Sequence, residues 1–92
     1  MKEQINKFLG SLGKNQMAFL LRSCTIMDVA TIGKSLGLSA AASEKMADAI
    51  AQKQANAGVK FFEYADVDGK PTMLTKVTVR QVVYHYQEHG TV

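Results

Sequence analysis

Three residues near the C-terminus, His85, Glu88 and His89, follow the pattern H-x-x-E-H, in which two histidines bind zinc and the glutamate acts as a general base. Residues four apart share one face of a helix, so both imidazoles can reach the same metal ion. The pattern also needs a ligand further along the chain, and only three residues follow His89. We therefore expect no metal here, and we interpret both histidines as polar residues at a helix end, where the helix dipole favours them.

The segment DVDG at 66–69 has the residue types of part of a calcium-binding loop. In the EF-hand register the first ligand would be Tyr64 and the twelfth Thr75, and neither is the carboxylate that calcium requires there. An Asp-Gly pair between two runs of β-branched and aromatic residues is instead typical of a β-hairpin. We predict a tight turn and no calcium site.

The second half of the chain carries aromatic side chains that would suit stacking on single-stranded nucleic acid: Phe61, Phe62, Tyr64, Tyr84 and Tyr86. Each stacked base contributes ~1–3 kcal/mol. The alternative is that Phe61 or Phe62 packs beneath a hairpin and that Tyr86 joins a helical stripe of valines. Because only one face of a hairpin can be exposed, we favour packing in the core.

No arrangement typical of an enzyme stands out in the sequence. We find no Ser-His-Asp order, no glycine-rich phosphate loop and no supported pair of carboxylates, so we predict a protein that is not an enzyme and uses no cofactor. Cys24 is the only cysteine, which excludes an internal disulfide and a cysteine-based zinc site. We expect a buried thiol in a reducing cytoplasm, with a disulfide across a dimer as the alternative.

Length and composition indicate one globular domain, residues 1–92, with 47% hydrophobic and 21% charged residues. The longest apolar run near the N-terminus, MAFLL, is far shorter than the ~20 residues of a membrane span, so we expect a cytoplasmic protein without a membrane partner. The net charge is +3, which permits a polyanionic partner without requiring one. Residues 1–58 hold seven basic and four acidic side chains, whereas residues 59–92 hold four of each.

Four helices are predicted in the first part of the chain, at about 2–12, 14–24, 27–36 and 40–57. In the first three, apolar residues recur with the spacing of a helix that buries one face: Ile5, Phe8, Leu9 and Leu12; Met17, Leu20, Leu21 and Cys24; Val29, Ile32 and Leu36. Gly13, Gly37 and Gly58 follow helix ends, and Ser39 is the expected cap of the fourth helix.

A hairpin and a fifth helix are predicted in the remainder. The runs VKFFEYA and TMLTKVTV flank the Asp-Gly turn, and Pro71 lies at the edge of the loop, where its missing N–H is harmless. Thr78 and Gln81 have the spacing of a capping box, which would start a helix at about 79–89. The apolar stripe of that helix consists of Val79, Val82, Val83 and Tyr86.

This order of elements resembles that of winged helix-turn-helix proteins over residues 14–77, with extra helices at both ends. In that family a small residue lies where the two helices of the motif cross, and a glycine follows four residues later at the turn. Gly33 and Gly37 occupy these two places. The resemblance implies an α+β winged helix-turn-helix fold with one hairpin as its wing.

The resemblance also implies roles for the residues after the turn. Leu38 would face the core, and Ser39 would start the recognition helix. Ser43 departs from the family pattern, which usually has a branched apolar residue there, so Met46 and Ile50 would have to hold the helix against the core.

The recognition helix is not a typical DNA-reading helix in its charge. At about 100° per residue, we expect its core side to carry Ala42, Met46, Ala49, Ile50, Lys53 and Ala57. Directly opposite lie Glu44, Asp48, Ala51 and Ala55. Helices in the major groove usually present Arg, Lys, Asn or Gln to base edges, so two carboxylates at the centre of the exposed face weaken the DNA interpretation.

We nevertheless predict a small winged-helix transcriptional regulator of phage, plasmid or bacterial type that binds double-stranded DNA through helix 40–57 and the wing. The candidate contacts on the helix are Ser39, Ser43, Lys45, Gln52 and Gln54. The candidate phosphate contacts elsewhere are Lys34, Lys60, Lys70, Lys76 and Arg80. The alternative is a winged-helix protein–protein interaction module, an inhibitor or adaptor that does not bind DNA.

The two terminal helices suggest a homodimer. Their apolar stripes either pack on each other or cover a second copy, and added helices commonly serve dimerisation in small winged-helix regulators. The candidate dimer interface consists of Ile5, Phe8, Leu9, Leu12, Val79, Val82, Val83 and Tyr86.

Overall fold

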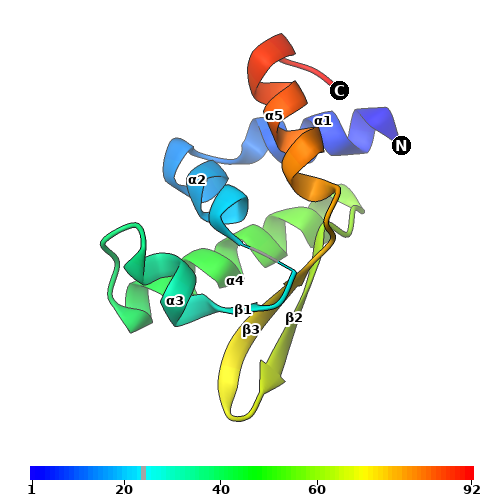
Figure 1. Cartoon of the computed structure of the whole chain (residues 1–92). Coiled ribbons are helices and arrows are strands. Elements are labelled where there is room, and N and C mark those ends of the chain that lie inside the picture. The colour runs from blue at the N-terminus through cyan, green and yellow to red at the C-terminus, as the bar shows by residue number, and fades with distance from the viewer. Residues whose placement is uncertain (24) are drawn as a thin grey trace.

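The computed structural model describes residues 1–23 and 25–92. Along the chain its elements are α1 (Lys2–Ser11), α2 (Lys14–Arg22), β1 (Met27–Asp28), α3 (Val29–Lys34), α4 (Ala40–Ala57), β2 (Phe62–Val67), β3 (Lys70–Thr75) and α5 (Val79–His89). The described part is therefore α+β, with five helices and one antiparallel sheet (Figure 1). Cys24, which we expected to be buried at the end of the second helix, lies outside the described residues.

The sheet has three strands in the order β1-β3-β2. β2 and β3 form the predicted hairpin, with Phe62 opposite Thr75 and Val67 opposite Lys70. The two turn residues both have positive φ, 52° at Asp68 and 78° at Gly69. This is the conformation that suits the twist of a two-residue hairpin, so the prediction from the Asp-Gly pair is confirmed. The hairpin extends away from the helices (Figure 1).

Strand β1 was not predicted. Met27 and Asp28, which we placed in the third helix, pair with Met73 and Thr72 of β3. The helix begins only at Val29, because the Asp28 carboxylate accepts a 3.1 Å hydrogen bond from the Thr31 backbone N–H and thereby caps α3.

The start of the last helix also differs from the prediction. Thr78 has helical φ and ψ of −74° and −13°, and its side chain makes no capping hydrogen bond. The expected capping box with Gln81 is therefore wrong. A capping residue needs an extended backbone, but here the chain enters the helix from a turn that is closed by Val79 N–H donating to Lys76 O at 3.1 Å.

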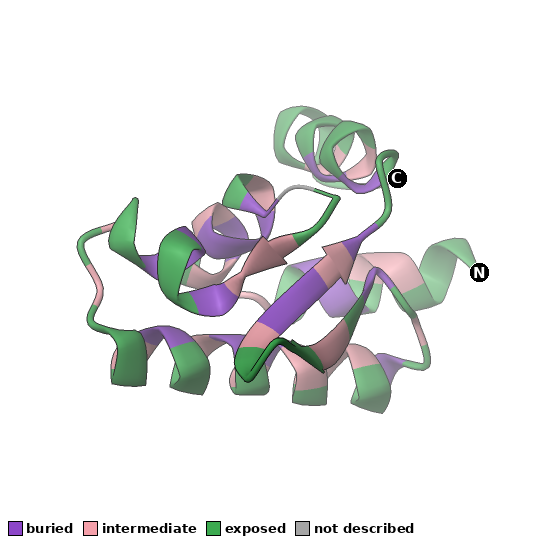
Figure 2. Ribbon diagram, turned by 60° about the horizontal axis from the view of Figure 1, so that its bottom comes forward, coloured by how far each residue is buried: buried purple, intermediate pink, exposed green. Residues whose placement is uncertain are grey.

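One core joins all five helices to the sheet. Its fully buried side chains include Phe8, Leu9, Phe19, Leu20, Val29, Ile32, Ile50, Phe62, Met73 and Val83. The rings of Phe8 and Phe61 meet edge to face at 5.0 Å, which brings α1 onto the start of the hairpin. Buried residues line the inner sides of the helices and the sheet (Figure 2). Among the described residues, no helix is both long and apolar enough to cross a membrane.

Candidate nucleic-acid interface

The crossing of α3 and α4 is unusually close at Gly33. A Cβ added to this residue would overlap Ser43 Oγ and lie 2.5 Å from Ser43 Cβ. Only glycine fits at this position, as we expected for the small residue of a helix-turn-helix crossing. The contact fixes the position of α4 relative to α3.

The turn between these helices is closed by a Schellman motif. Gly37 has a φ of 77°, a conformation that favours glycine. Leu38 N–H donates to Gly33 O at 2.8 Å, and Gly37 N–H donates to Lys34 O at 3.0 Å. Ser39 Oγ then accepts from the Ala42 N–H at 3.1 Å, so the predicted cap of α4 is confirmed.

Ser43 is not available to a ligand. Its side chain is fully buried against Gly33, and its Oγ donates a 2.7 Å hydrogen bond to Ser39 O. The expectation that it contacts DNA is therefore wrong. The same contact explains the departure from the family pattern, because a branched apolar side chain would not fit against α3 at this distance.

Gln54 also faces away from any ligand. Its Oε1 accepts from Phe61 N–H at 3.1 Å and from Phe62 N–H at 3.4 Å, while its Nε2 donates to Phe62 O at 2.9 Å. The expected DNA contact is wrong here too, since the whole amide is engaged by the backbone that enters β2. Gln54 instead joins α4 to the base of the hairpin.

The core side of α4 is rotated from the predicted one. Its buried residues are Ser43, Ala47, Ile50 and Ala57, whereas Met46 and Lys53 are only half-buried at one edge. Lys53 Nζ reaches across to donate to Ser11 O and Gln16 Oε1, at 2.6 and 2.7 Å. The small residues Ser43 and Ala47 therefore pack most deeply; the expected core face is confirmed at Ile50 and Ala57 and wrong at Met46 and Lys53.

This rotation changes what α4 exposes. At about 100° per residue, the centre of the face opposite the buried side carries Ala41, Lys45, Asp48 and Gln52, which are all exposed. Asp48 lies on this same stripe, between Lys45 and Gln52, as predicted, whereas Glu44 lies to the side of it.

Glu44 and Asp48 of α4 lie near the β2–β3 hairpin. Partial burial raises the pKa of the Tyr64 phenol on β2, and the negative charges of Asp48 and Glu44 raise it further. The two carboxylates are therefore close to Tyr64, between α4 and the hairpin. The sequence singled out Tyr64 only as a candidate stacking residue, and its place beside two carboxylates of α4 depends on tertiary contacts.

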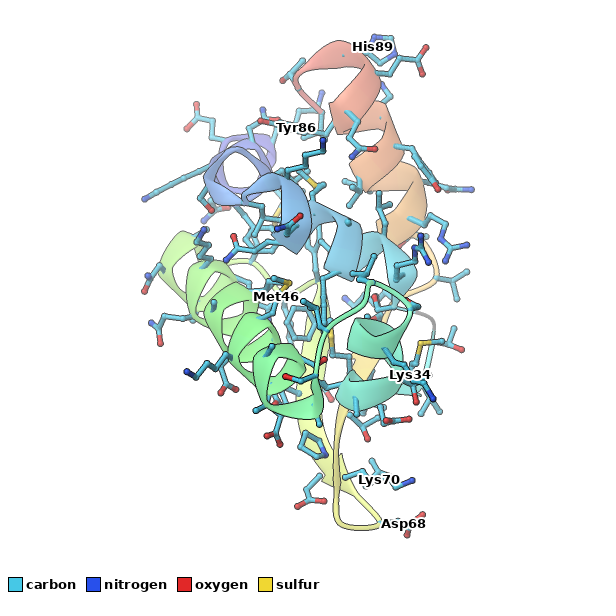
Figure 3. All side chains as sticks on the ribbon, turned by 90° about the vertical axis from the view of Figure 1, so that its left-hand side faces the viewer. Lys34, Met46, Asp68, Lys70, Tyr86 and His89 are labelled. Atoms are coloured by element: carbon cyan, nitrogen blue, oxygen red, sulfur yellow. The ribbon has the colours of Figure 1, made fainter. Side chains whose placement is uncertain are left out.

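The structure separates the predicted phosphate contacts into two groups. Lys34 ends α3 and Lys70 starts β3, and both lie at the end of the molecule opposite His89 (Figure 3). Lys60, Lys76 and Arg80 lie at the other end of the hairpin. There Lys60 Nζ forms a 2.8 Å ion pair with Glu63, and Arg80 donates to Leu21 O at 3.0 Å. Lys70 lies beside the start of α4, where it lines a hollow with Ala40 and Glu44, whereas Lys34 lies on α3, which packs on the buried side of α4.

Comparisons with known proteins add nothing to this geometry. No family model matches the chain, and no similar curated protein or solved structure is found.

Acidic residues surround Lys70. A hollow of about 250 Å³ near the tip of the hairpin is lined by Lys70 together with Asp28 and Glu44. Asp66 and Asp68 flank the same turn and are exposed. The hairpin tip is therefore mixed in charge.

Half of the residues predicted at a dimer interface pack within one chain instead. Phe8, Leu9, Val79 and Val83 are buried in the core, so their expected place at a dimer interface is wrong. The other four residues of the set are half-buried and stay accessible: Ile5, Leu12, Val82 and Tyr86. The homodimer itself stays a prediction.

The two histidines and the two adjacent phenylalanines contact other residues of the chain. His85 and His89 lie side by side with ring centroids 4.4 Å apart, and His85 Nδ1 is 3.1 Å from Thr91 O. No group of three or more potential metal ligands is found in the described part of the chain. Phe61 and Phe62 are buried, as expected for core residues.

Proposed function

We propose that the chain is a winged-helix protein that binds double-stranded DNA as a small transcriptional regulator. In this proposal α2, α3 and α4 form the helix-turn-helix unit, and the β2–β3 hairpin is the wing. The order of elements, the sheet order β1-β3-β2 and the glycine-dependent crossing of α3 and α4 support the winged-helix assignment.

The observation that carries the proposal is the exposed face of α4. Beside Asp48 this face carries a small residue, Ala41, which permits close approach to a groove, and Lys45 and Gln52, whose side chains have the donors that base edges require. Lys70 near the start of α4 and Lys34 at the end of α3 are the candidate phosphate contacts. The exposed carboxylate of Asp48 on the same face opposes phosphate, and its charge, together with that of Glu44, also acts on Tyr64.

The test is binding to duplex DNA of random sequence, followed by fluorescence anisotropy at several salt concentrations. We expect binding that weakens as salt rises. Lys45→Gln, Lys34→Gln and Lys70→Gln should each weaken it, whereas Lys14→Gln, an exposed lysine at the start of α2, should leave it nearly unchanged. Absence of binding at low salt, or an equal loss with Lys14→Gln, would refute the proposal.

A second candidate function is docking on a protein with a basic surface. It is favoured by the carboxylates of Asp28, Glu44, Asp66 and Asp68, which surround the hairpin tip and the start of α4. The double variant Glu44→Gln/Asp48→Gln separates the two functions. It should preserve or strengthen DNA binding under the first proposal, and it should abolish binding of the protein partner under the second.

A further inference from the structure

A second cavity lies away from the exposed face of α4. It has a volume of about 380 Å³ and lies between α1, the segment that enters β2, the segment that leaves β3, and the first turns of α5. Figure 1 shows these elements converging at the base of the hairpin. The cavity takes no part in the proposed DNA contacts.

The walls of this cavity are mainly apolar. Ile5 of α1, Val59 before β2 and Val82 of α5 line it, together with the partly accessible edges of Phe61 and Val79. These aliphatic and aromatic side chains would cover the hydrocarbon part of a small ligand.

The polar groups at the rim are cationic or hydroxylic. Lys60, Lys76 and Thr78 line the cavity, and no acidic residue does. The Thr78 side chain makes no capping bond to α5. Lys60 is paired with Glu63 at 2.8 Å, and Lys60, Glu63 and Lys76 together line a neighbouring hollow. One carboxylate balances only one of the two lysines.

We propose that this cavity binds a small organic anion with an aliphatic body. The anionic group would lie at Lys76, Lys60 and Thr78, and the body would lie against Ile5, Val59 and Val82. Charge complementarity selects an anion, and the small volume of the pocket suits a small molecule better than a protein surface, which needs roughly 800 Å² from each partner.

The cavity lies where a bound ligand would contact both connections of the hairpin. Residues 58–61 and 76–79 are the two connections that join the hairpin to the rest of the chain, and both line it. Lys76 N–H donates to Phe61 O at 3.5 Å, so the two connections lie side by side. An effect of the ligand on DNA affinity would rest on the proposed function, whereas the binding itself does not.

The test is a titration of the ¹⁵N-labelled protein by NMR, with hexanoate as the probe. We expect saturable shifts of the amides of Val59, Phe61, Thr78 and Val82. Hexanamide, which lacks the charge, and inorganic phosphate, which lacks the aliphatic body, should each bind at least about tenfold more weakly, a difference of about 1.4 kcal/mol.

Variants test the assignment of the rim. Lys60→Gln/Lys76→Gln should weaken hexanoate binding about tenfold, and the matched control Lys7→Gln/Lys14→Gln, which removes two exposed lysines elsewhere, should not. The proposal is overturned if hexanoate causes no saturable shifts, if phosphate binds equally well, or if the rim variant keeps its affinity. It is also overturned if the lining amides respond to protein dilution instead, because a second copy would then fill the cavity.

Discussion

The backbone of Gly33 lies directly against the side chain of Ser43, with no space for a Cβ between them. α3 has only six residues and is too short to be stable by itself. Its position therefore depends on this contact and on the burial of Val29 and Ile32. The orientation of α4, and with it the candidate interface, depends on the same contact.

Replacement of Gly33 by alanine should destabilise the fold by about 3 kcal/mol, because the added methyl group forces α3 and α4 apart. Urea unfolding followed by circular dichroism measures the change. Gly10→Ala is the matched control. Its Cβ would meet only the end of the Tyr86 side chain, at 3.2 Å, and alanine is favoured in a helix, so stability should stay equal or rise. Equal losses in both variants would contradict the role of the crossing.

Gln54→Ala should lower the free energy of unfolding by about 1–3 kcal/mol, since it leaves the N–H groups of Phe61 and Phe62 without their partner. Gln52→Ala provides the comparison, because Gln52 is exposed and bonds only to Asn56 across one helical turn; its effect should stay within about 0.5 kcal/mol. Chemical denaturation distinguishes the two, and a Gln54→Ala protein as stable as Gln52→Ala would contradict the prediction.

Asp28→Ala should cost about 1 kcal/mol at neutral pH through loss of the α3 cap. The Thr31 hydroxyl is the main cause that lowers the pKa of Asp28; partial burial opposes it, and the Thr31 N–H adds to the lowering. A lowered pKa in the folded state means that the stabilisation is present above the unfolded-state pKa and is lost as the pH falls through the folded-state pKa. The difference between the two proteins should therefore shrink in acid. Asp66→Ala, which removes an exposed carboxylate on β2, is the control and should change stability at neutral pH by less than about 0.5 kcal/mol.

Tyr64 should titrate above its ordinary pKa of about 10, because it is partly buried and the charges of Asp48 and Glu44 disfavour the phenolate. The folded state then holds this proton more tightly than the unfolded chain. The resulting stabilisation is present below the unfolded-state pKa and is lost as the pH rises through the folded-state pKa. Asp48→Asn/Glu44→Gln should lower the pKa of Tyr64. An NMR titration of the ring, assigned with Tyr64→Phe, would show an unchanged pKa if the carboxylates were directed elsewhere.

Local signals in the sequence predicted much of the fold. The Asp-Gly turn, the Ser39 cap and the left-handed glycine at residue 37 depend on residues a few positions apart, so they can be recognised without knowledge of tertiary contacts. The strand at Met27 and Asp28 could not be recognised in this way. Two residues carry no periodicity, and their pairing with β3 exists only once the hairpin has formed.

The candidate site was harder to predict than the fold. Apolar size suggested a core face of α4 around Met46, but the closest packing is made by the small residues Ser43 and Ala47, which carry almost no hydrophobic signal. Gln54 looked like an exposed polar residue, because the backbone groups that it binds return to it only after the chain reverses at Gly58. Both errors concern residues whose roles depend on tertiary neighbours.

The three hydrogen bonds of Gln54 have a mechanical consequence for the hairpin. Its base is anchored to α4 by a side chain, whereas its tip at Asp68 and Gly69 is exposed. β1 also holds β3 at Thr72 and Met73, so only the turn beyond these pairs is unsupported. Displacement is therefore largest at the turn, and the base keeps its separation from α4. A double helix held by both elements would have to adjust its groove to that separation, while the tip follows the local path of the phosphates.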